Sequence, residues 1–94
     1  MRRSALEIDI AILQALSAYS PLKLTHLMYK ANLNCNLLKA RLSFLEEKGL
    51  IKLNKVQRMH LYGPGRAQIL YGLTPEGMDV LRNYHSVYLA LGSS

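Results

Sequence analysis

The sequence predicts a single α+β domain that is mainly α-helical with a small β-hairpin, in the order helix, helix, helix, hairpin, helix. Three observations lead to this prediction. Apolar residues recur every three or four positions through most of the chain, the period changes to alternation after Gly49, and capping residues stand where helices should begin. The 94 residues, half of them apolar, suffice for one core, and we place the domain at residues 4–91.

The first helix begins at a capping box. The hydroxyl of Ser4 can accept a hydrogen bond from the backbone amide of Glu7, and the carboxylate of Glu7 can accept one from the amide of Ser4. The helix should run to about Tyr19, because Pro21 follows shortly and proline disfavours helical geometry in the residue before it.

The next two helices form a helix-turn-helix pattern. Apolar residues spaced by three and four predict a short helix over residues 22–31, and a leucine stripe predicts a longer one over residues 35–48. Asn34 is a good N-cap for the longer helix, and Gly49 directly after it is a strong stop signal. About three residues join the two helices and the second is basic, which is typical of helix-turn-helix pairs.

The hairpin and the last helix complete the domain. Apolar and polar residues alternate over residues 51–54 and again over 67–73, and the Gly-Pro-Gly run at 63–65 has the composition of a turn between them. Thr74 then caps a helix of about 16 residues that can run to Leu91.

The net charge of +6 is concentrated in the middle of the chain. Residues 23–66 hold nine Lys and Arg against two Glu, which gives this segment a charge of +7. A local positive field of this kind favours polyanions, and nucleic acid is the commonest polyanion inside a cell. The alternative is a solvated basic face without a ligand.

The sequence shows no sign of catalysis. One cysteine and three scattered histidines have no metal-ligand spacing, and neither a nucleophile motif nor a glycine-rich phosphate loop is present, so we expect neither an enzyme nor a cofactor. No apolar run approaches the ~20 residues of a membrane span. We therefore expect a cytoplasmic protein without a membrane partner, and no small-molecule effector is evident.

The element order and two short segments resemble the winged helix-turn-helix proteins. The segments are Leu45–Ile51 (LEEKGLI) before the hairpin and Leu73–Gly77 (LTPEG) after it. Within that fold the chain resembles small archaeal DNA-binding proteins of the ArnR-like group, which includes dimeric Sulfolobus chromatin-associated proteins, and Met28–Asn34 (MYKANLN) is similar to their turn region. The last helix is too short for the long antiparallel coil of some members. The resemblance implies a nucleoid-associated protein that binds double-stranded DNA.

In such a fold, helix 35–48 lies in the major groove, and the hairpin wing, residues 52–66, reaches the backbone or the minor groove. The expected DNA-binding residues lie at the start of this helix, on its side opposite the leucine stripe, and along the wing: Asn34, Asn36, Lys39, Ala40, Arg41, Ser43, Lys52, Lys55, Arg58 and Arg66. Lys23 and Thr25 stand where the preceding helix starts and are candidates to hold a phosphate.

These candidates have different expected roles. Asn34 is more simply an N-cap than a base contact, whereas Asn36 either pairs with adenine or faces solvent. Lys39 and Arg41 flank the groove face, and we expect phosphate contacts of them because backbone contacts outnumber base contacts. Arg66 follows the glycine-rich turn, where it either enters a narrow minor groove or belongs to an exposed basic loop.

The first and last helices are each apolar on more than one side, which predicts a homodimer. A small domain has no second layer to cover the extra apolar residues, and these helices lie away from DNA in a winged helix. We expect an isologous two-fold interface formed by Leu6, Ile10, Val80, Tyr84, Val87, Tyr88 and Leu91. The alternative is that these residues pack within the monomer.

The leading functional prediction is a DNA-binding protein, most simply a transcription regulator. Two alternatives stay open. One is an architectural, chromatin-type protein that binds DNA without sequence specificity, and the other is a winged helix whose basic surface docks an acidic protein. RNA binding is less favoured, because few aromatic residues are available to stack on bases.

Overall fold

The computed structural model describes residues 4–60 and 63–91, with the backbone alone at 57–60 and 63–67. The elements in these residues are α1 (Ala5–Tyr19), β1 (Leu22–Lys23), α2 (Leu24–Ala31), α3 (Cys35–Glu47), β2 (Ile51–His60), β3 (Gly63–Leu73) and α4 (Pro75–Ala90). The predicted fold class and order of elements are confirmed, and β1 is an addition to them.

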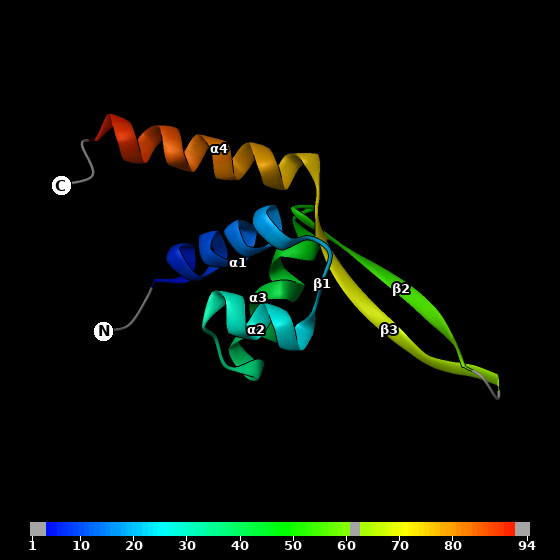
Figure 1. Cartoon of the computed structure of the whole chain (residues 1–94). Coiled ribbons are helices and arrows are strands. Elements are labelled where there is room, and N and C mark those ends of the chain that lie inside the picture. The colour runs from blue at the N-terminus through cyan, green and yellow to red at the C-terminus, as the bar shows by residue number, and fades with distance from the viewer. Residues whose placement is uncertain (1–3, 61–62, 92–94) are drawn as a thin grey trace.

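α1 is the central helix of the domain (Figure 1). α4 packs along one side of it in the opposite direction, while α2 and α3 pack against its other side. The hairpin β2–β3 projects from this helical body, and the domain measures 57 × 29 × 21 Å along its principal axes. The arrangement places α4 and α3 on opposite sides of α1.

The three strands form one antiparallel sheet in the order β1, β3, β2. Leu22 of β1 pairs with Tyr71, and Ile51 pairs with Leu73 at the root of the hairpin. The prediction that a helix begins at residue 22 is wrong by two residues, because Leu22 and Lys23 are held by β3. Two residues are too few to show a period, so the sequence carries no signal for this strand.

α1 is buried around most of its circumference. Ile12, Leu13 and Leu16 are at most 1% exposed, and Ile10 is 4% exposed. The expectation that Ile10 is left over for a dimer interface is therefore wrong. Because α1 lies between α4 and the α2–α3 pair, more than one of its apolar faces is covered within the monomer.

Local signals fix the start of α1 and the end of α3 as the sequence predicts. The hydroxyl of Ser4 accepts a hydrogen bond from the amide of Glu7 at 3.1 Å, and the Glu7 carboxylate accepts one from the amide of Ser4 at 3.3 Å. Gly49 follows Lys48, the C-cap of α3, and adopts a φ of +75°, a conformation in which a glycine commonly ends a helix.

Candidate nucleic-acid interface

α3 presents a polar face because its leucine stripe is buried. Leu38, Leu42 and Leu45 are at most 3% exposed, and they fix the rotation of the helix about its own axis on the core. The side chains on the opposite side are exposed, in agreement with the helical wheel: Asn36, Lys39, Ala40 and Ser43.

Asn34 holds the start of α3. Its Oδ1 accepts a hydrogen bond from the amide of Leu37 at 2.8 Å, so the capping role that the sequence favours is confirmed. Cys35, the first residue of the helix, is half-buried, whereas Asn36 is exposed. Both asparagines are exposed, but Oδ1 of Asn34 is engaged in the helix cap, so Asn36 remains the candidate for a base contact.

Arg41 pairs with Asp9 of α1 and does not extend freely from the exposed face of α3, where the sequence predicts a phosphate contact for it. Its Nε donates to Oδ1 of Asp9 at 2.7 Å and its Nη2 donates to Oδ2 at 2.6 Å, while the two side chains are only 23% and 12% exposed. Hydrogen bonding to Asp9 raises the pKa of the Arg41 guanidinium above its usual value. The phosphate contact expected of Arg41 is thus corrected to an ion pair with α1, because a buried carboxylate requires a partner.

Phe44 extends this cluster along α3. The guanidinium carbon of Arg41 lies 4.4 Å from the centre of the Phe44 ring, and Nζ of Lys48 lies 5.6 Å from it. Both cations therefore contact the aromatic ring at cation–π distances.

Lys39 lies on the exposed face of α3, and the phosphate contact that the sequence predicts for it stays a prediction.

β2 carries the described basic residues of the wing. Lys52 and Lys55 are exposed, and Lys52 pairs with Gly72 across the hairpin. A Cβ at Gly72 would lie 3.2 Å from Cε of Lys52. The side chain of Lys52 therefore lies over Gly72, which has no side chain of its own. The side chains of Arg58 and Arg66, the other predicted wing contacts, lie outside the described residues.

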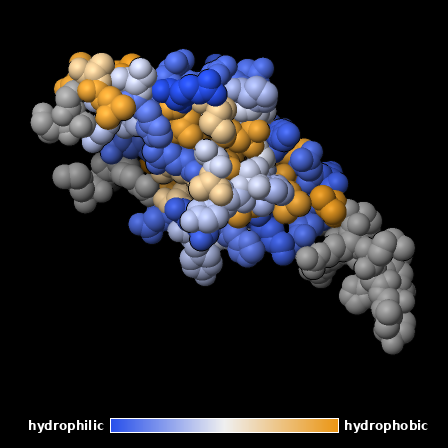
Figure 2. Space-filling view, turned by 45° about the horizontal axis from the view of Figure 1, so that its top comes forward, coloured by the Kyte–Doolittle hydropathy of each residue, from blue (hydrophilic) through white to orange (hydrophobic). Residues whose placement is uncertain are grey.

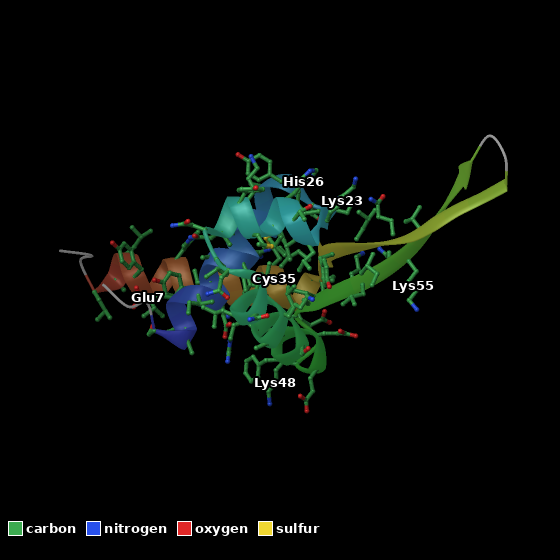
Figure 3. All side chains as sticks on the ribbon, turned by 90° about the horizontal axis from the view of Figure 1, so that it is seen from below. Glu7, Lys23, His26, Cys35, Lys48 and Lys55 are labelled. Atoms are coloured by element: carbon green, nitrogen blue, oxygen red, sulfur yellow. The ribbon has the colours of Figure 1, made fainter. Side chains whose placement is uncertain are left out.

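Polar residues on α2 and directly before it form a strip, of which only Lys23 and Thr25 are predicted site residues. Lys23 is half-buried, and Thr25, His26 and Tyr29 are exposed, the last to 83%. Thr25 and Tyr29 are four residues apart and share one helix face. Figure 3 shows Lys23 and His26 near one another at the start of α2, with Lys55 farther out on the wing.

Tyr29 was missed as a candidate backbone contact, although the sequence held a signal for it. It falls outside the apolar stripe of α2, whose buried members are Leu27 and Ala31, so its hydroxyl should point away from the core. A phenol hydroxyl can donate to a phosphate oxygen as a serine or threonine hydroxyl does. Thr25 and Tyr29 thus join the exposed face of α3 and the basic strand β2 in the candidate interface.

The described part of the chain has neither a metal-binding cluster nor a membrane-spanning helix. Within it, no three or more His, Cys, Asp or Glu side chains come together to hold a metal ion. None of its helices is long and apolar enough to cross a membrane.

Burial raises the pKa of the half-buried Tyr71, and nearby Glu46 and Cys35 raise it further, so this hydroxyl stays neutral at physiological pH.

Three solved structures with a similar fold bear the names of transcription regulators. A PadR family regulator from Clostridium difficile has a TM-score of 0.76 and 22% identity over 92% of this chain and 91% of its own. BldR from Sulfolobus solfataricus has a TM-score of 0.67 and 25% identity over 89% of this chain and 55% of its own. A MarR family regulator from Silicibacter pomeroyi has a TM-score of 0.64 and 22% identity over 82% and 47%.

The last two structures extend well beyond the shared region, since the chain spans about half of their length. No curated protein sequence matches the chain. At the level of sequence families, residues 2–90 match the family described as winged helix-turn-helix. This match takes in nearly the whole chain, and the chain belongs to the winged helix-turn-helix family.

Proposed function

We propose that this protein is a DNA-binding transcription regulator, a binding protein and not an enzyme, that acts on the nucleoid in the cytoplasm. The observation that carries the proposal is the exposed polar face of α3, flanked by the strip on α2 and by Lys52 and Lys55 of β2. When the protein binds duplex DNA, α3 enters the major groove, where Asn36 contacts the edges of the bases, and Lys39 contacts a phosphate.

Two further observations support this role. The structural neighbours bear the names of PadR and MarR family transcription regulators, and one of them, BldR, comes from the archaeon Sulfolobus solfataricus. The excess positive charge of the chain falls on residues 23–66, which contain α2, α3 and the wing. The BldR match is in keeping with an archaeal origin, which we retain as part of the proposal.

Selection of bound sites from a random duplex library tests the proposal. A sharp consensus supports a regulator that reads sequence. Binding without a consensus would replace it with the architectural role. An absence of binding at low salt with tens of micromolar protein would reject DNA as the ligand and favour an acidic protein partner.

The salt dependence of DNA binding should report the phosphate contact of Lys39. Each neutralised phosphate contributes about 0.9 to the slope of log affinity against log salt. Lys39→Gln should therefore make the slope shallower by about 0.9 per protomer, which is about 1.8 for a dimer that engages DNA with both protomers.

The matched control is Arg82→Gln on α4. Its side chain is 73% exposed and lies 3.9 Å from Asp79, so the change removes the same charge from a different element. The slope of this variant should equal that of the wild type. Equal slopes for Lys39→Gln and the wild type would show that Lys39 does not contact DNA.

We also propose that the regulator is a homodimer held together by the far end of α4 and the start of α1. Leu6, Val87 and Leu91 are 59%, 57% and 80% exposed. Figure 2 shows hydrophobic side chains gathered at the end of α4 that lies farthest from the wing. Large apolar side chains so exposed in a chain this small favour burial against a second copy.

The remaining members of the expected interface have intermediate positions. Val80 is 36% exposed, and Tyr88 is 50% exposed and stacks on the half-buried Tyr84 with ring centres 6.2 Å apart. The interface we propose is therefore centred on the last two turns of α4, farther from the core than the sequence suggests.

Val87→Lys should convert the dimer to a monomer, because it places a charge in the centre of this apolar patch. Sedimentation equilibrium should give about twice the chain mass of 10.6 kDa for the wild type and the chain mass for the variant. Ser86→Lys is the control, since it adds the same charge one residue earlier, on a different face of α4. A wild type that sediments at 10.6 kDa at tens of micromolar would contradict the dimer.

A further inference from the structure

The end of α3 meets the start of α4 at the root of the hairpin. We name this contact, formed by Gly49, Leu50, Thr74 and Gly77, the α3–α4 joint. Oγ1 of Thr74 donates to the carbonyl oxygen of Gly49 at 2.7 Å, and it accepts from the amide of Gly77 at 3.0 Å. The amide of Thr74 donates to the carbonyl oxygen of Leu50 at 3.2 Å. One threonine thus bonds to the turn that ends α3 and to the first turn of α4.

The joint has little room to move on either side. On the α3 side, the amide of Leu50 donates to the carbonyl oxygen of Leu45 at 2.9 Å and closes the end of the helix. On the α4 side, a Cβ at the buried Gly77 would overlap the carbonyl oxygen of Leu50 and lie 2.7 Å from Cδ1 of Leu73. The first turn of α4 therefore lies directly on the backbone that ends α3.

The two helices that meet here have different proposed tasks. α3 carries the DNA-binding face, and the far end of α4 carries the dimer patch. Away from the joint, α1 lies between the two helices (Figure 1). The 16 residues of α4 give it a length of about 24 Å, so a tilt of about 10° at the joint would move its far end by about 4 Å.

We propose that Thr74 is a positioning residue for DNA recognition. Its bond to Gly49 sets the angle between α3 and α4 and thereby the separation of the two recognition helices in the dimer. The inference rests on the proposed homodimer. Half-sites on one face of B-DNA repeat every ~34 Å, so a change of a few ångströms in this separation alters which spacing of half-sites is bound.

Two substitutions separate this role from simple capping of α4. Thr74→Asp keeps an oxygen that caps the helix, but a carboxylate has no hydrogen to donate to Gly49. Thr74→Ser keeps both the acceptor and the donor. Thr74→Val removes both bonds at almost constant shape and serves as a second variant if Thr74→Asp does not fold.

The separation can be measured directly by pulsed dipolar electron spin resonance. A spin label is placed at the exposed position 36 through Asn36→Cys, in a background where Cys35→Ser removes the native thiol. We expect one narrow distance distribution between protomers for this background and for Thr74→Ser. For Thr74→Asp or Thr74→Val we expect a distribution shifted or broadened by several ångströms. A distribution that both of these variants leave unchanged overturns the proposal.

Two further measurements show whether the homodimer or the DNA binding, on which this proposal rests, is itself wrong. An absence of coupling between protomers in the labelled background would overturn the dimer and, with it, the spacing role of Thr74. DNA binding is measured on unlabelled Thr74→Val with a duplex too short to engage both protomers, and its salt slope should equal that of the wild type because no phosphate contact is removed and no charge is added. A slope reduced by about one would mean that Thr74 acts through α3 itself, which would also overturn the proposal.

Discussion

Gly77→Ala should destabilise the protein by about 3 kcal/mol, at the upper end of what an added methyl group costs in a packed site. The new Cβ would overlap the carbonyl oxygen of Leu50 and press on Leu73, and the first of these neighbours is backbone that cannot rotate away. The gain of ~1 kcal/mol in helix propensity on replacing glycine offsets only part of this cost. Denaturant-induced unfolding followed by circular dichroism measures the change.

Gly49→Ala is the matched control for this prediction. A Cβ at Gly49 meets nothing within 4 Å, so the cost there arises only from its φ of +75°. An alanine in this conformation costs ~1–2 kcal/mol. A Gly77→Ala protein at least as stable as Gly49→Ala would show that α4 does not sit on Leu50 as described.

Arg41→Met should destabilise the domain by about 3 kcal/mol, because it leaves the carboxylate of Asp9 buried without its cation. Asp9→Asn should cost less, about 1–2 kcal/mol. The reason is that an asparagine still accepts one hydrogen bond, while Arg41, the more exposed partner at 23%, can turn toward water. Unfolding free energies of the two single variants and the double variant give the coupling of the pair.

The exposed pair Arg82–Asp79 supplies the control for this experiment. Its atoms are 3.9 Å apart and both side chains are mostly exposed, so Arg82→Met should leave stability unchanged within error. The DNA salt slope of Arg41→Met should equal that of the wild type as well. A slope reduced by about one per protomer would show that Arg41 contacts a phosphate despite its ion pair with Asp9.

Much of the fold could be predicted because local rules fix helix ends. The capping box at Ser4, the cap at Asn34 and the cap at Thr74 each act within three residues of the chain, and all three are present in the structure. The leucine stripe of α3 is likewise a local pattern, so its exposed face could be named in advance.

The errors have a common physical origin in contacts between distant parts of the chain. Ile10 is buried because α2, α3 and α4 all pack on α1, and the guanidinium of Arg41 is held by Asp9, which lies 32 residues earlier in the chain and is buried. β1 exists because β3 pairs with it. A helical wheel describes one helix at a time, and none of these contacts belongs to a single helix.

The central claim is that DNA meets the exposed face of α3 and the strand β2, and a nuclear magnetic resonance titration tests it most directly. Isotope-labelled protein is titrated at low salt with a duplex that contains the selected site, or with random duplex DNA if no site is selected. We predict shifts in the amide signals of residues 36–43 and 52–55, with residues 87–91 at the far end of α4 unchanged. An unchanged spectrum, or shifts confined to residues 87–91, would contradict the account.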